Sequence, residues 1–318
     1  MALTLKHCFT CLLLLTLSNI SYAASPEKKP GSIVVTIKPL YSLVAHLCEG
    51  IEEPVLLMQQ TQSPHHYNMR PSERRLLANA RVIVWIGPEM ESNLSKVIQQ
   101  QNHPVISAMQ AEGLTLLTRR TKNHASHSSK HQNHHRGDPL SSNNIDPHIW
   151  LSSKNAEAIS KHLSQQLSRV DPTNAVTYQK NLQQLLKKIR QSSTKTRHRL
   201  QQNRQPFLTH HDAFQYFEHE NTLNHIASIS GDKETTVSLK HLRHIKSLIK
   251  ENNIHCLLYQ PPKPDIIESL TSHNNIKAVA LDPLAQTALQ EKEAWFEMME
   301  NIRQNVSYCL SAPLLHSG

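Results

Sequence analysis

Long apolar runs, glycine and acidic side chains are all scarce in this 318-residue sequence. After the first 20 residues, no apolar run is long enough to span a bilayer, which indicates a water-soluble globular protein. The 7 glycines form no phosphate-binding loop, which argues against nucleotide chemistry. The HExxH and GxSxG motifs of metalloproteases and serine hydrolases are also absent. We therefore expect that the protein is not an enzyme.

The 25 acidic residues are outnumbered by 34 lysines and arginines, which gives a formal net charge of +9. Basic proteins often bind nucleic acid, and this possibility has to be considered first. Here the basic residues are scattered over expected helical faces, as at Lys187, Arg190 and Arg199, with no aromatic side chains interleaved. We expect a basic solvated surface and no nucleic-acid partner.

The first 23 residues have the pattern of a cleaved signal peptide. Lys6 supplies the positive charge, residues 8–17 form a short apolar run, and Ser21 and Ala23 are the small residues that a signal peptidase reads. The run is too short for a permanent membrane helix. No cysteine follows it at the place of a lipid anchor. We expect cleavage after Ala23 and a free periplasmic protein.

Of the five cysteines, Cys8 and Cys11 would leave with the signal peptide. An oxidising compartment then allows one bridge among Cys48, Cys256 and Cys309 and leaves one thiol. Cys309 lies near the C-terminus, where a bridge would prevent fraying of the last helix. We expect a Cys256–Cys309 disulfide, with three free buried thiols as the alternative.

Apolar stretches alternate with helical patterns, which predicts parallel βαβ units and an α/β fold. In the first half, the expected strands are 32–37, 54–57, 81–86 and 105–106, and the expected helices are 41–50, 71–80 and 89–101. In the second half, the expected strands are 206–209, 224–228, 254–259 and 276–281, and the expected helices start at 212 and cover 237–252, 264–273 and 286–308.

A long amphipathic pattern separates the two halves. Residues 171–203 predict a rigid linking helix of ~45 Å at 1.5 Å per residue. It would join an N-terminal lobe, residues 24–170, to a C-terminal lobe, residues 204–318. Residues 121–144 are polar and histidine-rich with almost nothing apolar, so they form a loop outside the core. The prediction is two similar parallel-sheet lobes with a cleft between them.

Histidine is unusually abundant, with 22 residues, and imidazole is a common metal ligand. His65, His148, His211 and Asp282 each follow or adjoin an apolar stretch. Ligands of parallel sheets bind beyond the carboxyl ends of the strands. Three imidazoles and one carboxylate there would suit tetrahedral Zn²⁺ in the interlobe cleft. From spacing alone, surface or helix-capping roles remain the alternative.

Several ordered motifs resemble those of the zinc-uptake solute-binding proteins of ABC importers, the ZnuA-like family. They are SPHHYNMRPS at 63–72, WIGPEME at 85–91, DPHIWL at 146–151, HDAF at 211–214 followed by Tyr216 and Phe217, and LDPL at 281–284. They cover nearly the whole mature chain. The resemblance implies a monomeric periplasmic protein that captures Zn²⁺ and delivers it to a membrane permease.

The resemblance implies that His65, His148 and His211 are zinc ligands and that Asp282 supplies a carboxylate. In zinc-binding members, water or a glutamate before the first histidine can take the fourth position instead. Pro64 stands there in this chain, so the glutamate is absent. Water, His66 and His210 are the alternatives to Asp282. The disulfide of the family also maps onto Cys256 and Cys309.

Metal identity is indicated by His211. Manganese-binding relatives carry a glutamate at this position, and harder oxygen ligands suit Mn²⁺ whereas extra imidazole suits Zn²⁺. A manganese- or iron-binding homologue, or a metal-binding adhesin or buffer, is the alternative function. Because protons compete for imidazole, we expect zinc affinity to fall below about pH 6.

Members of the family often carry a histidine-rich, acidic loop before the second ligand. Here His124, His127, His131, His134 and His135 lie in such an insert, but Asp138 is nearly its only acid. Neutral imidazoles there could bind metal weakly and raise its local concentration near the cleft. A solvated linker without a metal role is the alternative.

Overall fold

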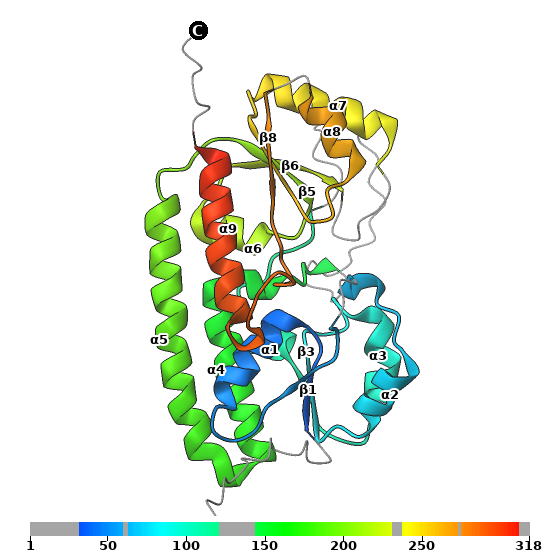
Figure 1. The fold of residues 1–318 in the computed structure, drawn as a ribbon, viewed down its shortest axis with the longest axis vertical. Coiled ribbons are helices and arrows are strands. Elements are labelled where there is room, and N and C mark those ends of the chain that lie inside the picture. Colours follow the sequence, from blue (N-terminus) through cyan, green and yellow to red (C-terminus); the bar gives the residue numbers. More distant parts are fainter. Residues whose placement is uncertain (1–31, 60–62, 121–143, 231–236, 273–274, 312–318) are drawn as a thin grey trace, which may run out of the picture.

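The computed structural model describes residues 32–59, 63–120, 144–230, 237–272 and 275–311. Two four-stranded sheets, both entirely parallel, form two lobes joined by a long helix (Figure 1). The predicted α/β class and two-lobed architecture are confirmed. The expected signal peptide, residues 1–23, lies outside the described residues.

The first sheet has the strand order β2-β1-β3-β4, formed by Val55–Leu56, Ile33–Val35, Val82–Trp85 and Val105–Ser107. Nearly every residue of these strands is buried, because helices cover both faces of the sheet. Helices α2 (Pro71–Ala78) and α3 (Ser92–Gln99) lie on one side, and α1 (Lys38–Leu47) lies on the other (Figure 1).

The second sheet has the order β6-β5-β7-β8, formed by His225–Ser230, Phe207–His211, Cys256–Tyr259 and Lys277–Ala280. Its helices are α6 (Gln215–Asn221), α7 (Leu239–Glu251) and α8 (Asp265–Thr271). The inward residues of α7 and α8, such as Ile245 and Ile267, form a separate apolar core with Leu208 and Leu257. This core makes the second lobe a packed unit of its own.

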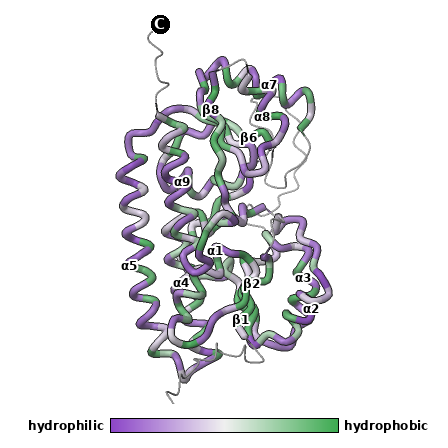
Figure 2. The backbone as a smooth tube through the Cα atoms, viewed as in Figure 1, coloured by the Kyte–Doolittle hydropathy of each residue, from purple (hydrophilic) through white to green (hydrophobic). Residues whose placement is uncertain are grey.

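Helices α4 (Ser153–Val170) and α5 (Ala175–Leu200) run side by side, and α5 extends along both lobes (Figure 1). Ser152 caps α4 by accepting a hydrogen bond from the backbone N–H of Asn155. The 26 residues of α5 span ~39 Å at 1.5 Å per residue, which confirms the predicted long helix. Figure 2 shows hydrophobic residues concentrated on the strands, whereas the outer α5 is largely hydrophilic.

The last helix, α9, covers Ala294–Leu310, so the predicted start at residue 286 is wrong. Ala285 has a positive φ of 55°, and residues 282–293 cross over to the first lobe. There the Ser42 hydroxyl donates to the carbonyl of Lys292 at 2.6 Å, and the Lys38 ammonium donates to that of Gln286 at 3.4 Å. The lobes are therefore connected twice, by α5 and by this crossing segment with α9.

The disulfide between Cys256 and Cys309 fastens β7 to α9 and confirms the expected pairing. Cys48 is a free, buried thiol in the core of the first lobe.

Among the described residues, no helix is both long and apolar enough to cross a membrane.

Candidate metal centre

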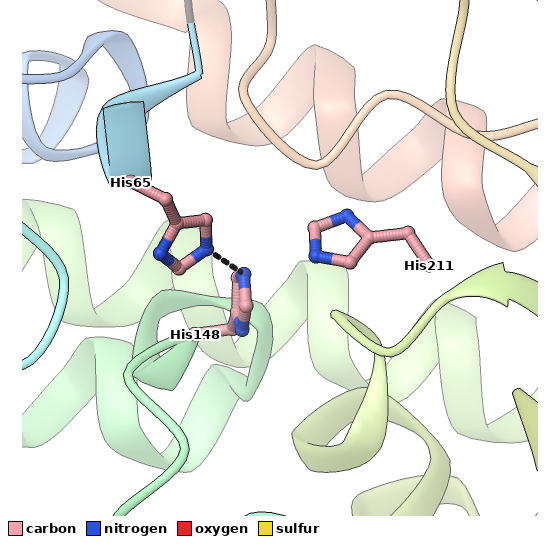
Figure 3. Close-up of side chains that lie close together, drawn as sticks. All are labelled: His65, His148 and His211. Atoms are coloured by element: carbon pink, nitrogen blue, oxygen red, sulfur yellow. Dashed lines mark hydrogen bonds between the residues drawn. The ribbon is translucent and has the colours of Figure 1, made fainter. Parts of the chain in front are cut away.

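Three histidines from distant parts of the sequence meet between the two sheets (Figure 3). His65 lies in a 3₁₀ turn, Pro64–His66, after β2. His148 directly precedes a second 3₁₀ turn, Ile149–Leu151. His211 is the last residue of β5, a strand that runs two residues further than the sequence pattern predicted. The first two come from one lobe and the third from the other.

One ring nitrogen from each histidine lies within 4.8 Å of the others. The Nε2 atoms of His65 and His148 are 3.4 Å apart. Two nitrogens bound to one tetrahedral zinc at ~2.0–2.1 Å would be separated by ~3.3 Å, which this pair already matches. The side chains are almost entirely buried, with exposed fractions of 8% for His65, 1% for His148 and 4% for His211. The triad is therefore arranged as a set of ligands and withdrawn from bulk water.

The space at the triad is very small. A cavity of about 10 Å³ is lined by the three histidines, Ser63, Pro64, Met90, Gln260, Pro283 and Leu284. A volume of ~10–15 Å³ is the minimum that holds one water molecule. The cavity therefore fits a single ion and excludes an organic ligand.

Hydrogen bonds select the tautomers of two of the rings. Asp146 Oδ1 accepts from Nδ1 of His148 at 2.7 Å and from its backbone N–H at 3.0 Å. Gln260 Oε1 accepts from Nδ1 of His211 at 2.9 Å. With Nδ1 protonated, each ring presents the lone pair of its Nε2. This is the usual way in which proteins orient metal-binding histidines.

The wall beside the triad depends on the turn after β3. Gly87 has a φ of 151°, a backbone conformation that L side chains rarely adopt, so any other residue there would be strained. The fully buried Glu91 accepts hydrogen bonds from the backbone N–H groups of Ile86 and Gly87, each at 3.0 Å. These contacts hold the turn and with it Met90, whose side chain lines the cavity.

Burial keeps two of the three histidines, His65 and His148, neutral. It lowers the pKa of His65 to about 2, with smaller contributions from the neighbouring His148 and His211. Burial also holds the pKa of His148 well below its usual value, with further contributions from His211 and Arg119. A lowered imidazole pKa means that the neutral, metal-binding form persists into acid. The fall in zinc affinity expected near pH 6 is therefore not produced by these two residues.

The number of protons released when zinc binds should show directly whether His65 and His148 are neutral. Three ordinary imidazoles with a pKa of ~6.5 would release ~2.7 protons per zinc at pH 5.5. Because His65 and His148 are already neutral, neither should release a proton, and we expect a number far below three. Calorimetry at pH 5.5 in two buffers of different ionisation enthalpy measures this number. A release near three would contradict the lowered pKa values.

The structure does not bring Asp282 into the triad. Its Oδ1 accepts from the backbone N–H of Leu284 at 3.1 Å, and its Oδ2 accepts from the N–H and the hydroxyl of Thr287 at 2.9 and 3.2 Å. The carboxylate thus fixes the turn that carries Pro283 and Leu284 over the cavity.

The two histidines considered as alternatives to Asp282 do not join the triad either. His66 is exposed, and His210 points away from the triad because successive strand residues face opposite sides.

The five histidines of the insert, His124 to His135, lie outside the described residues. The residues on either side of these histidines, up to 120 and from 144, are described, and they are paired with each other. The backbone N–H of Arg119 donates to Asn144 at 2.8 Å, and Thr118 forms an isolated antiparallel bridge with Ile145. Arg120 then forms an ion pair at 2.7 Å with Asp212, the neighbour of His211. The described residues that flank the insert are therefore paired with each other and joined to Asp212, beside His211.

Sequence reasoning missed Asp146 and Gln260 as orienting residues. Asp146 stands two residues before His148 in the DPHIWL motif, a spacing that a metal-site interpretation could have used. Gln260 has no sequence signal of its own, because it reaches His211 only through the pairing of β5 with β7.

Two parallel α/β lobes, a long connecting helix and a buried histidine triad between the lobes define a two-lobed α/β protein with a candidate metal-binding site. The sequence model of the ZnuA family, described as zinc-uptake complex component A, periplasmic, matches residues 33–309. The chain belongs to this family. The family consists of solute-binding proteins, so the prediction that the chain is not an enzyme is confirmed.

Curated relatives support this membership over most of their length. The high-affinity zinc uptake system protein ZnuA of Brucella suis is 27% identical over 311 residues, covering 88% of this chain and 91% of that protein. The Yersinia pestis protein of the same name is 25% identical over 305 residues, covering 92% and 96%.

Solved structures share the fold. A zinc-bound deletion mutant of ZnuA has a TM-score of 0.72 at 21% identity, covering 89% of this chain and 99% of that one. FpvC from Pseudomonas aeruginosa, in complex with Mn²⁺, has a TM-score of 0.73 at 20% identity and covers the same shares. Since zinc and manganese complexes are equally similar, the fold alone does not identify the metal.

Proposed function

We propose that this protein captures Zn²⁺ in the periplasm with His65, His148 and His211 and delivers it to the permease of an ABC-type zinc importer. The main support for this proposal is that three buried imidazole nitrogens lie within 4.8 Å of one another, in a cavity sized for one ion. Imidazole is a better ligand for Zn²⁺ than for Mn²⁺, which prefers oxygen. The names of the curated relatives, all zinc uptake proteins, support the same metal.

We propose that water fills the fourth position of the bound zinc. Asp282 is the ligand that the family resemblance implied. To bind the metal, its carboxylate would have to exchange the hydrogen bonds to Leu284 and Thr287 for the metal. A fourth position held by water would also ease release, because the protein then has three ligand bonds to give up.

The experiment that tests the proposal is a competition titration of the chelator-stripped mature protein with a zinc-sensitive dye. We expect one tight zinc equivalent per chain, which a 100-fold excess of Mn²⁺ does not displace. Displacement of zinc by an equal concentration of Mn²⁺ would favour a manganese-binding function. The absence of any tight equivalent would refute metal capture at this site.

We also propose that the histidine-rich insert concentrates zinc at the mouth of the site. The described residues that flank it are paired with each other, and Arg120 forms an ion pair with Asp212 beside His211, which supports a local role. Replacing His124, His127, His131, His134 and His135 by asparagine should abolish weak additional zinc binding and keep the single tight site. Deleting residues 122–136 should do the same. Unchanged total zinc stoichiometry in both variants would overturn this role.

A further inference from the structure

Gln260 is placed beside His211 by the pairing of two parallel strands. Strands β5 and β7 align Leu208 with Leu257 and Thr209 with Leu258. Continuing this alignment by two residues sets His211 next to Gln260. Aligned residues of neighbouring strands project from the same face of a sheet, so the two side chains point into the same space. The metal cavity occupies that space, and both residues line it.

The contact between these residues is directional. Nδ1 of His211 lies 2.9 Å from Oε1 of Gln260. An imidazole that binds metal through Nε2 carries its proton on Nδ1, which donates, and the amide oxygen of glutamine accepts. Gln260 also directly follows a well-anchored strand, because Cys256 at the start of β7 is bonded to Cys309 of α9. The acceptor is therefore held in a fixed place.

The two lobes hold their ligands with different acceptors. In the first lobe, His148 donates to the Asp146 carboxylate at 2.7 Å. In the second lobe, His211 donates to a neutral amide at a slightly longer distance. Charge-assisted hydrogen bonds are roughly twice as strong as neutral ones, and a carboxylate acceptor makes the ring a stronger metal ligand. Of these two histidines, His211 is therefore the weaker metal ligand.

We infer that Gln260 is a positioning residue that sets how tightly the second lobe holds the metal. Its amide orients His211 toward the bound ion, and its lack of charge keeps the ligand weak enough for release to a permease. This inference rests on the proposed function, since it concerns the same site.

Two variants of Gln260 test the inference. Gln260→Leu removes the acceptor, and Gln260→Glu keeps an acceptor and adds charge. At pH 7.5 we expect Gln260→Leu to weaken zinc binding by ~10–100-fold, the usual effect of losing an orienting residue. We expect Gln260→Glu to bind at least as tightly as wild type and to release zinc more slowly to a chelator in stopped-flow measurements. The metal-free proteins should unfold within about 2 °C of one another, because Gln260 is only partly buried.

Wild-type affinity in Gln260→Leu would overturn the inference and leave the proposed function intact. So would equal weakening in both variants, since a purely structural role gains nothing from glutamate. If wild type itself lacked a tight zinc site, the proposed function and this inference would fail together.

Discussion

Replacing His148 by alanine should weaken zinc binding by at least about 100-fold. Structural zinc sites release ~10–16 kcal/mol on binding, so one of four ligands accounts for ~3 kcal/mol, or two orders of magnitude in Kd. His148 is the most buried of the three and the one oriented by a carboxylate. Its loss also leaves Asp146 without that partner. The measurement is a competition titration of the variant against wild type.

The matched control is His198→Ala, which removes an exposed histidine from α5 that does not line the metal cavity. It should bind zinc as wild type does. His211→Ala tests the second lobe in the same way and should also lose tight binding. Circular dichroism of the metal-free variants separates a lost ligand from a lost fold. A folded His148→Ala protein with wild-type affinity would refute the assignment of this residue.

Removing the disulfide with Cys256→Ala and Cys309→Ala together should lower the free energy of unfolding by about 4 kcal/mol. The bridge closes a loop with a sequence separation of 53 residues, and the entropy it removes from the unfolded chain has this size. Denaturant titration of the metal-free protein measures the loss. We expect the tight zinc site to survive, because neither cysteine contributes a ligand.

A reducing agent provides the control for this prediction. Wild type in reductant should approach the stability of the double variant, and the double variant should not respond. Cys48 is free in both proteins, so any effect of the reductant on this thiol is the same in both. A double variant as stable as oxidised wild type would show that the bridge does not restrain the chain in the way that loop entropy requires.

The three histidines became candidates because each follows or adjoins an apolar stretch, and parallel sheets gather the carboxyl ends of their strands at one edge. That logic left surface and helix-capping roles open for His65, His148 and His211, and the resemblance to the zinc-uptake family implied that they are ligands. It failed for Gln260, because which strand lies beside β5 is decided by tertiary pairing and leaves no local pattern. It also failed to count the residues of β5, whose last pair with β6 joins His211 to Ser230.

The crossing segment, residues 282–293, shows the limit of helical propensity. Residues 286–293 contain several good helix formers, and the sequence predicted helix there. In the structure their backbone carbonyls instead bind Lys38 and Ser42 of α1. Trp150 adds a bond from its indole N–H to the carbonyl of Pro283 at 2.8 Å. These tertiary contacts outweigh local preference, and they also give Asp282 its capping role.

The measurement that tests the central claim most directly is X-ray absorption at the zinc K edge of the zinc-loaded mature protein. We predict three imidazole nitrogens and one oxygen at ~2.0–2.1 Å around a single zinc, with the oxygen retained in Asp282→Asn. A first shell with fewer than three imidazoles, or with sulfur, would contradict the histidine triad as the site of zinc capture. Loss of the oxygen ligand in Asp282→Asn would show that Asp282, and not water, is the fourth ligand.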